Sequence, residues 1–278
     1  MESIVARKMH RTLEPFYGMI FFTPAAPPRY AAAGVTGRQS GYFASRAAPM
    51  GAVPAEVVIA TFFNFYPGLV RDSMAGVWDN TDPHRLVEAR LGAADEALRE
   101  VLGESVDSPE MVEAAELARP AVADPVLAGR PLGAANAALR WPDEPHLVLW
   151  HALGVHRELR GDGHIAVLGE RAVGPCESLV LHAATEDVPA AALQGTRMWP
   201  EADWKSATAG LVERGLLESD GAFTDSGAAF RSAIENRTDE LAVELWEPLG
   251  EGGCHRLREL VRPWSRALLD SGHFGFGR

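Results

Sequence analysis

The chain has 278 residues, of which 47% are hydrophobic and 23% are charged, so it can bury the core of one large or two ordinary globular domains. The formal net charge of −12 repels nucleic acid and anionic membranes over most of the surface, so DNA binding would need a local basic patch. The apolar run at residues 16–22 is too short to span a bilayer, and two distant cysteines fit a reducing compartment. We therefore expect a cytoplasmic protein that does not bind membranes.

Helical patterns dominate the first 120 residues. The sequence predicts a helix over 3–14, an irregular connection rich in Pro, Gly and Ala over 24–53, and helices that open at Pro54 and Pro67. Residues 83–102 have apolar side chains at helical spacing and predict an amphipathic helix. Ser108 is typical of an N-cap, so we expect a further helix from Pro109 to about residue 119.

The second half begins after an Ala/Pro/Gly-rich stretch at 121–141. We predict an N-terminal helical domain over 1–120, a linker over 121–141 and a second domain over 142–278. In the second domain, Pro145 opens a helix to about residue 160, the glycines at 161 and 163 interrupt it, and His164 opens the next helix. Further helices are predicted to begin at Pro175 and Pro189.

Two short patterns occur twice in the same order. Glu-Pro at 14–15 recurs at 144–145, and Pro, Glu and Trp at 54, 56 and 78 recur at 175, 177 and 199. An internal duplication would make the chain two tandem helical halves that pack as a pseudo-dimer. Chance in a Pro/Ala-rich chain is the alternative, and both interpretations stay open.

Residues 200–231 carry the clearest fold pattern. A helix over 201–214 would end at Gly215, and the segment 216–224, with Asp220-Gly221 as its turn, predicts a short β-wing before another helix. This order resembles the MarR-type winged helix-turn-helix. The resemblance implies a mainly α-helical fold, with helices at about 226–246 and 251–271 that form a homodimer interface.

The whole chain also resembles an actinobacterial helix-turn-helix family, through the segments HRTLEPFYG, GYFASRAAPMGAVP, WPDEPHLVLW and RELRGDGH. Where the family pattern has a histidine two residues after Glu-Pro, this chain has Tyr17. The resemblance therefore gives no support for a metal ligand at that position. It implies a fold but no activity.

DNA is the partner that the fold resemblance implies, but the charges of the helix at 201–214 oppose it. The candidate DNA-contacting residues on this helix are Lys205, Ser206 and Arg214. Three acidic residues accompany them, and the wing sequence ESDGAF contains no Lys or Arg. Because DNA affinity depends on phosphate neutralisation by basic groups, we expect this module to serve mainly as a scaffold.

The segment RELRGDGH concentrates polar side chains at residues 157–164. In the plain interpretation, Asp162 caps the helix that starts at His164, and Arg157 pairs with Glu158. In the functional interpretation, Asp162 orients His164 as a general acid or base, and Arg157 or Arg160 holds a carboxylate or phosphate.

A second polar segment, HRTLEPFY, places His10 and Glu14 on one face of a helix, with Tyr17 near them. We predict that the two segments meet in one pocket. His10, Glu14 and His164 are residue types that could together bind a metal ion as two histidines and one carboxylate. No HExxH or Cys-rich spacing supports such a site, so no metal is predicted. No dinucleotide fingerprint, P-loop or nucleophile elbow is present, so the sequence assigns no cofactor.

The expected function is therefore small-molecule binding in a polar pocket on a winged-helix scaffold, for recognition or for catalysis as an enzyme of specialised metabolism. The alternatives are a MarR-like, ligand-responsive DNA-binding regulator and a protein-interaction scaffold without a pocket. The catalytic candidates are His164, Asp162, His10 and Glu14. The ligand-binding candidates are Tyr17, Tyr42, Asn64, His146, Trp150, Arg157, Glu158 and Arg160. The sequence names neither a ligand nor a reaction.

Overall fold

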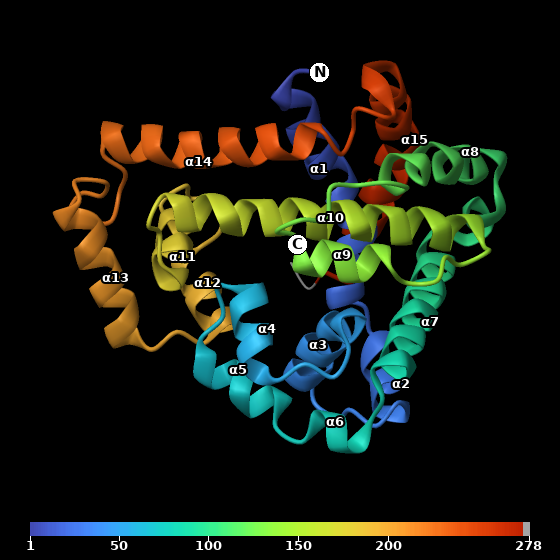
Figure 1. Ribbon diagram of the computed structural model, residues 1–278, viewed down its shortest axis with the longest axis horizontal. Helices are drawn as coiled ribbons and strands as arrows, with labels where there is room; N and C mark the ends of the chain where they lie inside the picture. The colour runs from blue at the N-terminus through green and yellow to red at the C-terminus, as the bar shows by residue number, and fades with distance from the viewer. Residues whose placement is uncertain (275–278) are drawn as a thin grey trace. The chain divides into compact units, whose positions relative to one another are not determined.

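The computed structural model describes residues 1–274 and is built almost entirely of helices (Figure 1). The predicted mainly α-helical class is confirmed. No helix within residues 1–274 is both long enough and apolar enough to cross a membrane.

The chain forms two compact units, each made of several segments. The first unit contains Met1–Val53, Gly76–Asp162 and the chain from Asp239 onward, and the second contains Pro54–Ala75 and Gly163–Thr238. These units interleave along the chain, whereas the predicted domains at 1–120 and 142–278 follow one another. Helices α10 (Pro145–Glu170) and α14 (Asp225–Val243) each continue from one unit into the other.

The first unit is a cluster of helices in which α1 packs chiefly on α15, and α7 packs on α2 and α3. Besides the first part of α10 and the end of α14, its α-helices are α1 (Ser3–Gly18), α2 (Ala26–Ala32), α3 (Arg38–Ala47), α6 (Val77–Asn80), α7 (Pro83–Leu102), α8 (Pro109–Ala118), α9 (Pro131–Ala137) and α15 (Gly250–Asp270). Short 3-10 turns connect several of them: Met19–Phe21, Ala48–Met50, Gly103–Asp107 and Pro120–Val122.

Helix capping explains why the boundaries of α7 and α8 are predictable. Asp82 accepts a hydrogen bond from the backbone N–H of His84, and Ser108 accepts one from that of Met111. In both helices a proline follows the cap, at the position where the missing N–H has no helical partner. The predicted helices at 83–102 and from Pro109 are confirmed.

Two segments predicted to be irregular contain helices. The connection at 24–53 holds α2 and α3, and the proposed linker at 121–141 holds α9. Their small residues obscure the apolar pattern but permit close packing. A Cβ atom at Gly133 of α9 would lie 2.4 Å from the side chain of Leu159 on α10, so only glycine allows this approach.

The predicted interruption of α10 is wrong. The helix continues from Pro145 to Glu170 through Gly161 and Gly163, so no helix begins at His164. Glycine costs a helix interior only about 1 kcal/mol relative to alanine, and packing on both sides outweighs that cost. The helix N-terminus predicted at His164 therefore does not exist.

The second unit contains α4 (Ala55–Phe62), α5 (Pro67–Met74), α11 (Pro175–Ala183), α12 (Ala190–Arg197) and α13 (Glu201–Glu213), with parts of α10 and α14. Helix α11 packs on both α12 and α13, and residues 198–200 form the turn between α12 and α13. The indole N–H of Trp199 in this turn donates to the carbonyl oxygen of Asn64 at 2.9 Å. The turn is thereby held by the segment between α4 and α5.

The predicted β-wing is not found as a pair of strands, because residues 1–274 contain no β-strand. Residues 216–224 instead form a tight hairpin turn with a single antiparallel bridge between Leu217 and Phe223. Gly215 has φ +68°, as predicted for the residue that ends the preceding helix. The MarR-like wing is therefore not supported.

Candidate functional site

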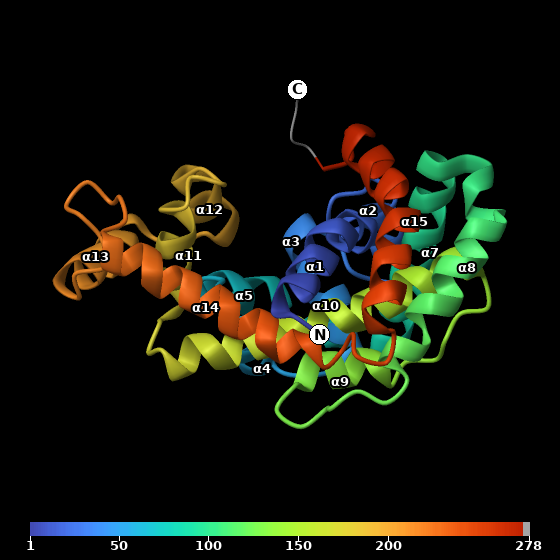
Figure 2. The ribbon, with the colours of Figure 1, turned by 90° about the horizontal axis from the view of Figure 1, so that it is seen from above.

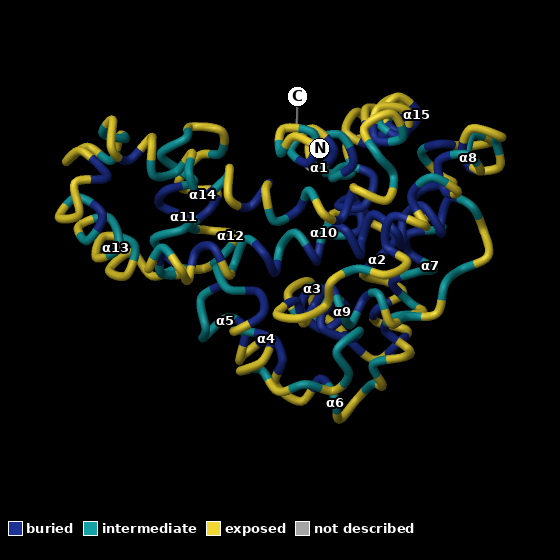
Figure 3. The backbone as a smooth tube through the Cα atoms, turned by 45° about the horizontal axis from the view of Figure 1, so that its top comes forward, coloured by how far each residue is buried: buried dark blue, intermediate teal, exposed yellow. Residues whose placement is uncertain are grey.

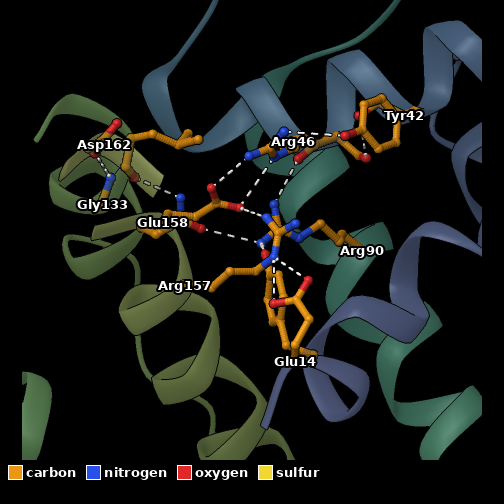
Figure 4. Close-up of polar contacts among 12 residues, drawn as sticks. Glu14, Tyr42, Arg46, Arg90, Gly133, Arg157, Glu158 and Asp162 are labelled. Carbon is orange, nitrogen blue, oxygen red and sulfur yellow. Dashed lines mark hydrogen bonds and ion pairs between the residues drawn. The ribbon is translucent and has the colours of Figure 1, made fainter. Parts of the chain in front are cut away.

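Glu158 on α10 is the centre of a buried ion-pair network in the first unit (Figure 4). Its side chain is 1% exposed, and its carboxylate accepts hydrogen bonds from Arg46 at 2.8 Å and Arg157 at 2.9 Å. Burial alone would raise the pKa of Glu158, but the two guanidinium groups outweigh it and lower the pKa to about 2. Glu158 is therefore ionised and occupied by its partners.

Arg157 connects this network to α1. Its Nε donates to Glu14 at 2.9 Å, and its guanidinium lies over the rings of Tyr17 and Phe21, 5.6 and 4.9 Å from their centroids. Burial opposes the charge of Arg157, but Glu14 and Glu158 hold its pKa well above the ordinary value. The predicted meeting of the two polar segments is thus present in the structure.

Arg90 on α7 adds a third buried cation. It donates to the carbonyl oxygen of Ser45 at 3.1 Å, the hydroxyl of Tyr17 at 2.7 Å and the side chain of Asn136 at 3.3 Å. Sequence reasoning missed Arg90 and Arg46. The available indication was a charged residue at a buried position of an amphipathic helix, since Arg90 lies four residues after the buried Leu86.

Asp162 has a different partner from the one predicted. Its carboxylate accepts a hydrogen bond from the backbone N–H of Gly133 at 2.8 Å, near the start of α9 (Figure 4). Burial raises the pKa of Asp162 to about 6 despite this hydrogen bond. Its role here is to cap α9, a helix that the sequence did not predict.

The predicted pair of Asp162 and His164 is not formed. The Nδ1 atom of His164 lies 2.9 Å from the hydroxyl of Thr238, and both residues belong to the second unit. Because residues two apart on a continuous helix point in different directions, an unbroken α10 separates these two side chains. The acid–base interpretation of RELRGDGH therefore loses its central pair.

A small pocket lies beside the ion-pair network, within the first unit. Its free volume is about 30 Å³. Five predicted site residues line it: His10, Glu14, Tyr17, Arg157 and Arg160. The other lining residues are Leu13, Leu153, His156, Ala242, Leu245 and Trp246.

His156 is the residue that the site prediction omitted. It is 5% exposed, and neither of its ring nitrogens has a hydrogen-bond partner among residues 1–274. Its ring stacks on that of Trp246, with centroids 3.7 Å apart and planes 8° apart. Burial lowers the pKa of His156 to about 3, so the ring is neutral at pH 7. No sequence motif distinguishes His156 from the other histidines of α10.

Arg160 is held at the pocket wall by Asp239. Its guanidinium lies 3.1 Å from Asp239, which is 1% exposed and also accepts a hydrogen bond from Arg7 on α1. A carboxylate shared between two arginines fixes both cations in position. The pocket therefore has a rigid guanidinium wall.

The remaining ligand-binding candidates do not line this pocket. Trp150 stacks on Tyr17 with centroids 5.1 Å apart, and His146 lies 2.7 Å from Asp95. The hydroxyl of Tyr42 accepts a hydrogen bond from Arg46. Asn64 belongs to the second unit, where its carbonyl accepts from Trp199.

Within residues 1–274, no three His, Cys, Asp or Glu side chains are grouped closely enough to hold a metal ion. His10 and Glu14 approach each other at 3.9 Å, as their helical spacing predicts. His10 and Glu14 belong to the first unit, and His164 belongs to the second.

Much of α13 is exposed (Figure 3), and its exposed charged residues are Glu201, Asp203, Lys205 and Glu213, so acidic groups outnumber basic ones there. Lys205 pairs with Glu201 at 2.6 Å, and Arg214 pairs with Glu177 at 3.5 Å. Ser206 is exposed beside Lys205. Over the second unit, 13 Asp and Glu oppose seven Lys and Arg. Few cations on this unit are therefore available to contact phosphates.

Comparison with curated proteins gives no significant match, and comparison with solved structures gives none either. A family model described as a helix-turn-helix family matches residues 6–275. The match covers nearly the whole chain, including both the pocket and the α11–α13 arrangement. The chain therefore belongs to this helix-turn-helix family.

Proposed function

We propose that this protein binds a small polar molecule in the pocket beside His156. The main support for this proposal is His156, whose neutral, buried ring lines the pocket. Neither of its ring nitrogens has a hydrogen-bond partner among residues 1–274. A buried polar atom without a hydrogen bond costs about 1–3 kcal/mol. A ligand that bonds these nitrogens removes that cost, which supports a binding function.

The walls define the class of ligand. A neutral imidazole offers one donor and one acceptor, and Arg160 beside it adds guanidinium donors. Trp246 and three leucines supply apolar walls. We propose a small ligand that has an acceptor, a donor and a flat apolar part. Binding is proposed rather than catalysis, because the acid–base pair predicted from the sequence is not formed.

The size of the pocket sets a second requirement. A free volume of about 30 Å³ holds about two water molecules, which is less than a typical ligand needs. The side chain of His10 is 33% exposed, whereas Glu14 is held by its hydrogen bonds from Arg157, so His10 is the polar lining group that moves at least cost. We propose that His10 swings outward when a ligand enters.

Ligand-observed NMR with a library of small carboxylic acids, amides and phenols tests this proposal. The key variant is His156→Phe, which keeps a flat ring against Trp246 and removes both nitrogens. The matched control is His151→Phe. His151 is also buried on α10 with an unpartnered ring nitrogen, but it does not line the pocket. Binding that survives His151→Phe and is lost in His156→Phe supports the proposal, and equal binding by both variants contradicts it.

A DNA-binding regulator is the second candidate function, supported by membership of the helix-turn-helix family and by the packing of α11 on α12 and α13. In this function α13 would contact DNA through Lys205, Ser206 and Arg214. The test is fluorescence anisotropy of labelled genomic fragments with a Lys205→Ala/Arg214→Ala variant. A loss of affinity supports α13 as the DNA-contacting helix, and unchanged affinity contradicts it.

A further inference from the structure

Helices α1 and α15 come from opposite ends of the chain and lie side by side in the first unit (Figures 1 and 2). Thr12 joins them, because its hydroxyl accepts from Arg258 at 3.1 Å and its carbonyl oxygen accepts from Ser265 at 2.8 Å. Phe16 and Trp264 pack beside this junction, with ring centroids 6.2 Å apart. The two helices therefore present one joint outer surface.

That surface is basic. Helix α15 carries Arg258, Arg262 and Arg266 at intervals of four residues, which place them along one side of the helix. Helix α1 carries Lys8 and Arg11, both exposed, and Lys8 lies one turn before Thr12. We call these five residues the α1–α15 ridge. Arg262 and Arg266 are also exposed, and Arg258 is half-buried.

The charges of the ridge are not neutralised within the part of the chain that the structure describes. None of the five forms an ion pair there, whereas neighbouring Arg256 pairs with Glu113 through two contacts of 2.7 Å. Burial and the positive charge of Arg262 lower the pKa of Arg258, as expected when like charges are crowded. Such crowding is unusual in a chain whose net charge is −12.

We propose that the α1–α15 ridge binds the phosphate backbone of double-stranded DNA. Arg258 to Arg266 advances about 12 Å along α15, a length over which duplex DNA carries about seven phosphates. Guanidinium groups suit phosphate because they donate two parallel hydrogen bonds. The contact is independent of base sequence, and it requires neither the His156 pocket nor α13.

Fluorescence anisotropy with a labelled duplex of about 30 base pairs and mixed sequence, titrated at several salt concentrations, tests the proposal. The ridge variant is Arg11→Glu/Arg262→Glu/Arg266→Glu. The control variant, Arg38→Glu/Arg85→Glu/Arg140→Glu, makes the same change in net charge at three exposed arginines elsewhere in the first unit. Circular dichroism of both establishes folding, and the single variant Arg262→Glu replaces the triple if the triple unfolds.

We expect the wild-type chain to bind the duplex with an affinity that falls steeply as salt rises from about 50 to about 200 mM. The ridge variant should lose about tenfold or more in affinity relative to the control. Its plot of log affinity against log salt should also be less steep, with a slope that is less negative by about three. Equal losses in the two triple variants overturn the proposal. Absence of DNA binding by the wild type at low salt, with binding to anionic phospholipid vesicles instead, also overturns it.

Discussion

His156 lies flat against Trp246, with 3.7 Å between ring centroids, and both residues line the pocket in the first unit. The stack leaves both ring nitrogens of His156 buried without hydrogen-bond partners among residues 1–274. Close packing alone does not require a histidine there, because a phenylalanine would stack on Trp246 without buried polar atoms. The imidazole therefore costs stability, and the ligand that we propose would offset that cost by bonding the ring nitrogens.

His156→Phe should leave the protein at least as stable as the wild type at about pH 7, with a gain of up to about 2 kcal/mol in the free energy of unfolding. The variant should also be less sensitive to acid. Because the folded pKa of His156 is about 3 against 6.5 in the unfolded chain, wild-type stability falls as pH falls below 6.5, by about 2 kcal/mol at about pH 5 from this residue. Urea unfolding at both pH values measures this. A large destabilisation of the variant at neutral pH would show that the nitrogens have structural partners.

Glu158→Gln should destabilise the protein by about 3–5 kcal/mol, because it leaves Arg46 and Arg157 buried without their shared carboxylate. The wild-type contribution is present above pH 4.5 and is lost as pH falls toward 2, since the folded pKa is lowered. Chemical denaturation is the measurement. Glu113→Gln, which removes an exposed ion pair with Arg256, is the control and should have a much smaller effect. Similar losses in both variants would contradict the network's structural role.

Asp162→Asn should keep an oxygen that accepts from Gly133 and remove a charge that burial disfavours. The folded pKa of about 6 exceeds the unfolded value of 3.8, so ionisation lowers wild-type stability as pH rises between these values, by up to about 1.4 kcal/mol per pH unit. The variant should lack this pH-dependent contribution to stability and should retain the contributions of the other titratable groups. The stability difference between variant and wild type, followed from about pH 4 to about pH 7, isolates it. A constant difference would contradict the raised pKa.

Trp199→Phe should cost about 1 kcal/mol, because it removes the hydrogen bond to the carbonyl of Asn64 and keeps an aromatic ring near Tyr66. Hydrogen exchange should become faster in residues 63–66 and 197–200, where the turn between α12 and α13 is held. Tyr66→Phe, which retains the ring, is the control and should leave the exchange unchanged. Unchanged exchange in Trp199→Phe would show that the turn is held by other contacts.

Local chemistry explains the helices that the sequence predicted. Helices α7 and α8 each begin with an N-cap residue followed by a proline, Asp82-Pro83 and Ser108-Pro109. The effect of such a pair depends only on neighbouring residues, so both helices begin where expected. The path of α10 depends instead on packing along its length. For that reason the glycines at 161 and 163 suggested an interruption that the folded chain does not have.

The candidate site was predictable only in part, for a related reason. His10, Glu14 and Arg157 stand out because polar residues concentrate at helical spacing in two short segments. Arg46 and Arg90 belong to no distinctive polar motif, and their partnership with Glu158 and Tyr17 arises only when four helices, α1, α3, α7 and α10, meet in the folded chain. His156 shares α10 with other buried histidines, and its place in the pocket wall against Trp246, which distinguishes it from His151, exists only in the folded chain.

Native mass spectrometry of the protein purified from its own host shows directly whether a ligand occupies the pocket at His156. We expect the wild-type chain and His151→Phe both to carry a small organic molecule that denaturation releases, and His156→Phe to have the mass of the bare chain. A wild-type mass equal to that of the bare chain, or a molecule retained equally by His156→Phe, would contradict a ligand at the ring nitrogens of His156.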